Sequence, residues 1–119
     1  YTTEEPPLNF TNNSDKNFAT NENVSGFSSD IVKEIIRRNN YDATITLLPW
    51  ARSYQYAQIQ INTFIYSMSK TKMRSNKFKW VGPIALKKTI LFQNKNSNFN
   101  FKSFLYPIKK TLFLSCGTS

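Results

Sequence analysis

The chain has no histidine, and Cys116 is its only cysteine. A metal site built from histidine and cysteine ligands is therefore excluded, as are serine–histidine and cysteine–histidine catalytic pairs. One cysteine also excludes a disulfide within the chain. No apolar run approaches the roughly 20 residues that a membrane-spanning helix needs. We expect that the chain is not an enzyme, because it has no evident residues for general acid–base catalysis, and we expect it to bind no cofactor.

Acidic residues are missing from most of the chain. All seven lie in the first 42 residues: Glu4, Glu5, Asp15, Glu22, Asp30, Glu34 and Asp42. The net charge is +9, and every charged residue after Asp42 is Lys or Arg. This asymmetry fits a basic interaction module for nucleic acid or an anionic membrane surface, and it also fits a solvated basic face. The lysines are scattered and no nucleic-acid motif occurs, so we expect no nucleic-acid partner.

The remaining patterns predict one α/β domain, because 119 residues are enough for one domain at most. The clearest helix covers residues 27–40, with Ser28 or Ser29 as a cap and an apolar core stripe through Phe27, Ile31 and Ile35. Strands are expected at residues 1–3, 41–48, 61–66, 78–81 and 89–92, with a short helix at 50–58. Their alternation predicts a mostly parallel sheet flanked by helices.

Residues 65–83 suggest a small-anion site. Ser67, Ser69 and Thr71 follow an apolar strand, where their hydroxyls can contact a ligand or cap a following helix. Arg74 is placed to reach back over the strand end and to hold a carboxylate by two hydrogen bonds. The same residues would also fit caps and one solvated charge. We expect Gly82-Pro83 to stop the next strand.

Four segments together resemble the first lobe of a type II periplasmic binding protein of bacterial extracellular solute-binding family 3. These segments are residues 2–10, 25–41, 47–54 and 67–84, and the resemblance covers residues 1–92. It implies an incomplete α/β lobe one at residues 1–92, whose ligand would lie in a cleft closed by a second lobe. It also implies that the chain lacks the second lobe and the family's returning strand. Residues 93–119 would then be a poorly defined tail and a remnant of the crossover in a truncated protein, although IKKTLFLS would fit one more strand.

The resemblance also assigns ligand-binding residues. Arg74 matches the arginine that binds a ligand carboxylate, Ser69 matches a second contact to that carboxylate, and Ser67 matches a contact to the ligand amine. Trp50 matches an aromatic residue that lines the cleft, although it would equally fit a core anchor. Glu5 falls at the position of an aromatic lid, where an acid would pair with a basic ligand or lie in solvent.

The resemblance implies the substrate-binding component, or a truncated remnant, of an ABC-type importer in amino-acid transport. Its ligand would be an amino acid or a related small carboxylate, and its partners the importer's membrane subunits if a full receptor exists. The location would be periplasmic or secreted, although the chain shows no signal peptide. No acid follows Asp42 to hold a ligand amine, and half the cleft is missing, so we expect binding weaker than about 1 mM or no binding.

Overall fold

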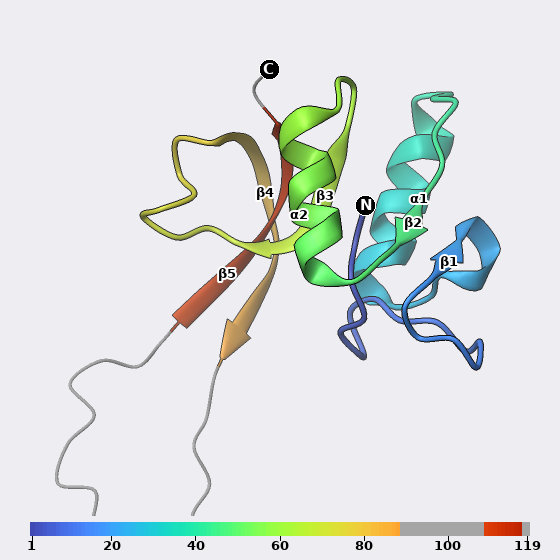
Figure 1. Ribbon diagram of the computed structural model, residues 1–119. Helices are drawn as coiled ribbons and strands as arrows, with labels where there is room; N and C mark the ends of the chain where they lie inside the picture. Colours follow the sequence, from blue (N-terminus) through green and yellow to red (C-terminus); the bar gives the residue numbers. More distant parts are fainter. Residues whose placement is uncertain (89–108, 118–119) are drawn as a thin grey trace, which may run out of the picture.

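The computed structural model describes residues 1–88 and 109–117. The helices α1 and α2 lie beside two sheets (Figure 1). The first residues of the chain lie between these sheets and hydrogen-bond to both. The elements are β1 (Ala19–Thr20), η1 (Asn21–Asn23), α1 (Phe27–Arg38), β2 (Thr46–Leu47), α2 (Trp50–Ile59), β3 (Phe64–Ser69), β4 (Phe78–Lys88) and β5 (Lys109–Gly117). Within the described residues, no helix is both long and apolar enough to span a bilayer.

Residues 1 and 2 connect the two sheets. The Thr2 amide donates to the Thr46 carbonyl at 3.0 Å, and the Leu48 amide donates to the Thr2 carbonyl at 3.0 Å. On the other side, the Tyr66 amide donates to the Tyr1 carbonyl at 3.1 Å. Thr2 and Leu47 form a parallel bridge. The strands therefore lie in the order β1, β2, residues 1–2, β3, β5, β4.

The α/β lobe that we expected is confirmed, but its strand pairing differs from a simple parallel sheet. β3 and β4 both pair antiparallel with β5, so β3 and β4 run in the same direction without touching as neighbours. β1 and β2 are also antiparallel. In the part of the chain that the structure describes, parallel pairing occurs only where residues 1 and 2 lie beside β2 and β3. The expected parallel direction therefore holds for β3 and β4, while an opposing strand separates them.

β5 overlaps the segment IKKTLFLS, so the alternative of one more strand there is confirmed, whereas the expectation that the chain lacks a returning strand is wrong. Residues 109–117 return to the sheet and pair with both β3 and β4. The chain thus supplies a returning strand from its own C-terminal part. The expected domain boundary at residue 92 and the expected strand at residues 89–92 lie outside the described residues, so the boundary stays a prediction.

β4 continues through Gly82-Pro83, so the prediction that these residues end the strand is wrong. The register with β5 shifts between Val81 and Ala85, and Gly82 has a φ of 120°. Proline cannot donate to a ladder and is tolerated in a strand at such an irregularity. The two residues therefore bend the strand instead of stopping it.

The start of α1 also differs from our prediction. Gly26 is the N-cap, and no side chain caps the helix. Ser28 and Ser29 lie buried in the first turn, where the Ser29 hydroxyl is 2.9 Å from the Tyr66 hydroxyl. The predicted caps instead connect the helix to β3.

The core face of α1 is rotated from the stripe that we predicted. Val32 is buried and Ile36 packs beside it, whereas Phe27 and Ile35 are exposed (56% and 38%). The buried serines and Val32 face the core because they lie about one turn apart on the helix. This first core contains Ala19, Val24, Val32, Ile45, Leu47 and Tyr66.

A second core lies beside α2 and β3. It contains Ala57, Ile65, Met68 and Phe78. Trp50, Tyr54 and Trp80 are partly buried and pack against it. These three aromatic side chains therefore have one part in the core and one part toward solvent.

Candidate functional site

The parallel segments end at one edge of the lobe. Residues 1–2, β2 and β3 run in the same direction, so the segments that follow them leave the sheet at the same edge. These segments carry Glu5, Trp50 at the start of α2, and the residues from Ser67 to Arg74. Figure 1 shows the turn after the N-terminal segment, the start of α2 and the end of β3 on the lower side of the view.

Arg74 lies on two aromatic rings at this edge. Its guanidinium carbon is 4.9 Å from the centroid of the Trp50 ring and 5.4 Å from that of Tyr54. The two rings are 5.4 Å apart. One Nη donates a long hydrogen bond of 3.4 Å to the Ser69 carbonyl. Stacking engages the faces of a guanidinium and leaves its in-plane N–H groups directed outward, where they can meet a planar carboxylate.

The backbone that holds Arg74 is a series of turns, not the helix start that we predicted. Residues 72–77 are turns between β3 and β4. The Arg74 amide donates to the Thr71 carbonyl at 3.0 Å, and the Lys77 amide donates to the Arg74 carbonyl at 3.1 Å. Ser69 and Thr71 therefore cap no helix here, and the turn itself brings Arg74 back to the end of β3.

Ser67 marks an irregularity at the end of β3. Its φ is 60°, and the pairing with β5 shifts register between Ile65 and Met68. A positive φ is strained for a residue with a side chain, and such strain gathers at functional sites. Its hydroxyl is buried and has no hydrogen-bond partner among the described residues. Ser67 thus offers an unsatisfied polar atom two residues before Ser69.

Glu5 lies in a tight turn after the N-terminal segment. Its amide donates to the Asn9 carbonyl at 2.7 Å, and its carbonyl accepts from the Leu8 amide at 2.9 Å. Pro6-Pro7, within this turn, is a cis peptide. The topology places Glu5 at the same edge as Trp50, and its part in a ligand site stays a prediction.

The site contains aromatic residues that sequence reasoning missed. Tyr54 is 5.6 Å from Phe78, and Phe78 is 5.9 Å from Trp80, measured between ring centroids. Lys70 Nζ lies 5.7 Å from the Trp80 centroid. We call the rings Trp50, Tyr54, Phe78 and Trp80 the aromatic row; a cation contacts each of its ends.

The spacing of these aromatics was the available signal. Tyr54 follows Trp50 by four residues and so shares its helix face, while Phe78 and Trp80 alternate along one face of a strand. Arg52, which lies between Trp50 and Tyr54 in the sequence, is exposed. The row is therefore a consequence of helix and strand periodicity combined with the packing of α2 on the sheet.

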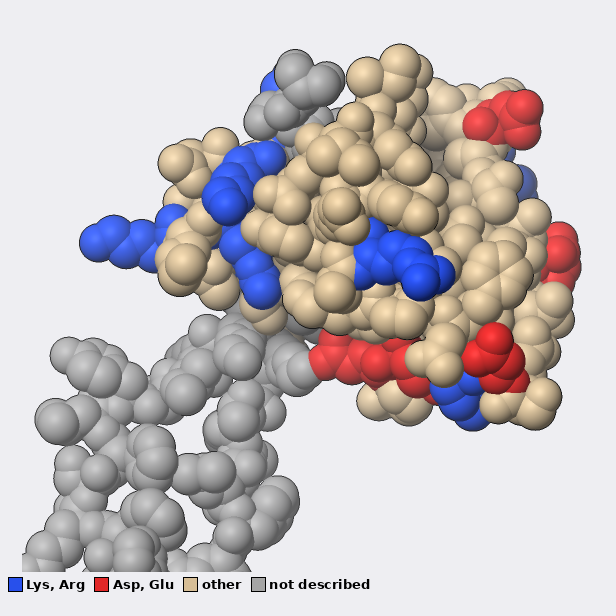
Figure 2. Space-filling view, in the orientation of Figure 1, with Lys and Arg blue, Asp and Glu red and all other residues tan. Residues whose placement is uncertain are grey.

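The cations near the site outnumber Glu5, the acid that we place at the same edge. No acid occurs from residue 43 onward, so Arg74 and Lys70 lie on aromatic faces in a part of the chain that offers no carboxylate. Figure 2 shows Lys and Arg side chains over the side that carries the β3–β4 connection, while Asp and Glu gather toward the right and lower edge. A site with this charge favours an anionic group over a cationic one.

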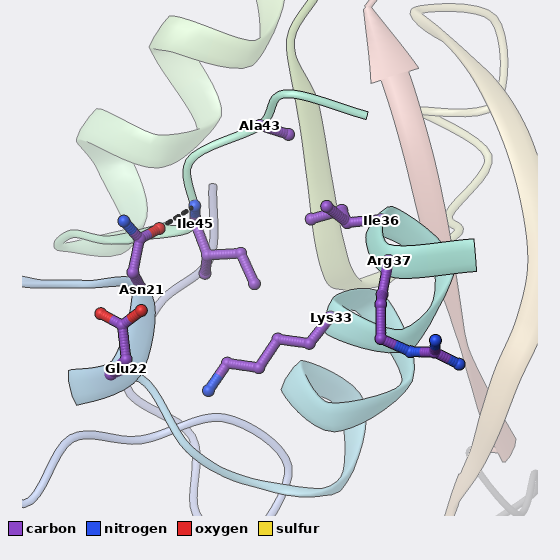
Figure 3. A pocket seen from close by; sticks show the side chains of 7 residues that line it. All are labelled: Asn21, Glu22, Lys33, Ile36, Arg37, Ala43 and Ile45. Atoms are coloured by element: carbon purple, nitrogen blue, oxygen red, sulfur yellow. Dashed lines mark hydrogen bonds between the residues drawn. The ribbon is translucent and has the colours of Figure 1, made fainter. Parts of the chain in front are cut away.

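A separate pocket of about 340 Å³ lies between α1 and the segments around η1 and β2. None of the predicted ligand residues line it. Figure 3 shows Lys33 extending across it from α1. Three of its polar residues have partners: Asn21 accepts from the Ile45 amide at 3.1 Å, Lys33 donates to the Val24 carbonyl at 2.7 Å, and Arg37 pairs with Glu34 at 2.7 Å. We therefore assign no ligand to it.

Comparison with known proteins supports a solute-binding role. Residues 1–112 match the family described as bacterial extracellular solute-binding proteins, family 3. The match includes the start of β5 as well as the residues of the candidate site. Neither the curated proteins nor the solved structures contain a match to the chain. The chain belongs to the bacterial extracellular solute-binding proteins of family 3.

Proposed function

We propose that this lobe binds a small polar solute through a carboxylate, with an amino acid as the expected type, for an ABC-type importer. The observation that carries the proposal is the position of Arg74, held by Trp50 and Tyr54 at the edge where the parallel segments end. The chain would be the importer's substrate-binding component or a truncated remnant of one. The importer's membrane subunits would be its partners, and it would act in the periplasm or outside the cell.

The roles of the site residues follow from their contacts. Arg74 would bind the carboxylate with its outward N–H groups, and Ser69, whose carbonyl already contacts Arg74, would support that binding. The unpaired Ser67 hydroxyl would accept from the ligand amine. Trp50 would pack against the ligand, and Glu5 would meet a positive group at the rim. None of these roles needs a cofactor or a catalytic step.

The affinity of the single lobe should be low. A good small-molecule site buries 70–90% of its ligand. The candidate site lies at one edge of one lobe, and no acid from residue 43 onward balances a ligand amine. We expect a dissociation constant above about 1 mM, which corresponds to less than about 4 kcal/mol of binding free energy.

A titration by NMR tests the role of Arg74. Amino acids added to the ¹⁵N-labelled chain at 1–50 mM, a range set around the expected constant of about 1 mM, should shift the amide signals of residues 67–74 and the indole signal of Trp50. Arg74→Ala should abolish these shifts, because the carboxylate loses its charged partner. Arg52→Ala is the control, since Arg52 is exposed and contacts no ring of the aromatic row that we have described. Unchanged shifts in Arg74→Ala would refute carboxylate recognition by this residue.

A further inference from the structure

The connection between β3 and β4 is a strongly basic turn. We call residues 70–77 the basic turn; its four cations are Lys70, Lys72, Arg74 and Lys77, and it contains no acid. Met73 lies in the middle of the turn and is 84% exposed. Figure 1 shows the connection projecting to the left, on the other side of the molecule from α1. The turn thus places one exposed apolar side chain among four cations, an arrangement that suits an anionic surface with an apolar interior.

The basic turn has a defined shape. Two backbone hydrogen bonds close it, from Arg74 to Thr71 and from Lys77 to Arg74, at 3.0 and 3.1 Å. The Trp80 indole donates to the Ser75 carbonyl at 3.1 Å, which ties the turn to β4. Lys70 and Arg74 lie over the aromatic row at its base. The turn therefore presents the exposed side chains of Lys72, Met73 and Lys77 on a fixed backbone.

We propose that the basic turn docks the protein on a membrane surface rich in anionic phospholipid. Lys72 and Lys77 would face the lipid phosphates, and the Met73 thioether would enter the boundary between headgroups and acyl chains. This role lies beyond the proposed solute binding, and it uses the exposed residues of the turn, not its ligand-facing arginine. Each lysine near such a surface contributes about fivefold to the partition constant.

Nucleic acid fits the same surface less well. Proteins that bind single strands offer aromatic faces on which bases stack. Here cations lie over the faces of Trp50, Tyr54 and Trp80. The apolar tip at Met73 adds nothing to a contact with a phosphate backbone, whereas it adds buried area in a lipid interface. DNA binding is therefore the competing outcome of the test.

Co-sedimentation of the full chain with vesicles tests the proposal. The vesicles contain phosphatidylcholine alone or phosphatidylcholine with phosphatidylglycerol in a 7:3 mixture, at roughly 0.05 and 0.3 M salt to vary screening. We expect binding to the anionic vesicles only, weakened by salt. Lys72→Gln combined with Lys77→Gln should lower the partition constant about 25-fold, and Met73→Ser should lower it several-fold. The control, Arg37→Gln combined with Arg38→Gln, removes the same charge from exposed positions on α1 and should change binding less than about twofold.

Three results would overturn the proposal. These are equal binding to both kinds of vesicle, equal losses in the turn variant and the α1 variant, and tighter binding to a DNA duplex than to anionic vesicles at the same salt. All four substituted charges are on exposed side chains, so circular dichroism should show the same fold in every variant. Because neither Arg74 nor Trp50 is changed, the NMR titration with amino acids reports separately on solute binding.

Discussion

Gly26 is a residue whose replacement the backbone should tolerate poorly. Its φ is 115°, and a Cβ added there would lie 2.5 Å from the Leu8 carbonyl oxygen, which belongs to the backbone. Gly26→Ala should therefore lower the free energy of unfolding by about 2–4 kcal/mol, through backbone strain and steric overlap. Urea denaturation measures this loss. Gln55→Ala at an exposed position on α2 is the control and should change stability by less than about 0.5 kcal/mol. Equal losses of stability in the two variants would contradict the predicted strain at residue 26.

Tyr66 makes stability depend on alkaline pH. Burial raises the pKa of its hydroxyl to about 12, and the hydrogen bond from Ser29 only partly offsets this effect. The unfolded chain loses this proton near pH 10, whereas the folded chain keeps it until about pH 12. The stabilisation is present below pH 10 and is lost as pH rises, by roughly 2–3 kcal/mol in total.

Urea unfolding between pH 8 and 12 should show this loss. Tyr66→Phe, which has no proton to lose, should start less stable because Ser29 loses its partner, and should then depend less on pH over this range. A wild-type chain that loses no more stability than Tyr66→Phe would contradict the raised pKa.

Individual residues of the candidate site were predictable to different degrees. Arg74 and Ser69 could be named as candidates from the sequence, because a hydroxyl cluster and an arginine after a buried strand have a recognisable chemistry, and their role in ligand binding stays a prediction. Tyr54 and Trp80 were missed as site residues, because their part depends on how α2 packs on the sheet. The positive φ of Ser67 has no signal in the sequence, since serine carries no preference for that conformation.

At the scale of elements, local sequence patterns predicted where the helices lie but not which helix face is buried or where β4 ends. α1 and α2 lie where periodicity predicted them, because apolar spacing and flanking residues are local signals. The face that α1 buries depends on its neighbours, so Phe27 and Ile35 lie exposed where we expected core. The local sequence at Gly82-Pro83 predicts the end of a strand, but β4 continues past it because β4 pairs with β5 on both sides of these residues.

The returning strand leads to a prediction about truncation. The lobe that we predicted ends at residue 92, but β5 pairs with β3 and β4 along their length. A chain of residues 1–92 would leave the facing edges of both strands without partners, so it should unfold at lower urea than the full chain and with a smaller m-value. Denaturation of the two chains measures both quantities. Identical curves would contradict this prediction, because they would show that β5 adds nothing to the stability of residues 1–92.

At the scale of the whole molecule, strand direction was more predictable than strand order. Alternating helices and strands imply parallel connections, and β3 and β4 do run in one direction. β5 lies between them, and its pairing with β3 joins residues more than 40 positions apart. No local sequence pattern encodes such a distant pairing. The distribution of charge, in contrast, was visible in the sequence, because all the acids precede residue 43.

The central position of β5 also determines when the protein can fold during synthesis. The chain emerges from the ribosome N-terminus first, so α1, α2, β3 and β4 are all made before Lys109 appears. Until then, the strands on either side of β5 expose edges that a nascent chain or a neighbouring one can pair with. Among the described strands, β5 is made after those it pairs with and therefore closes this sheet, and before it emerges the edges of β3 and β4 are exposed to aggregation and to chaperones.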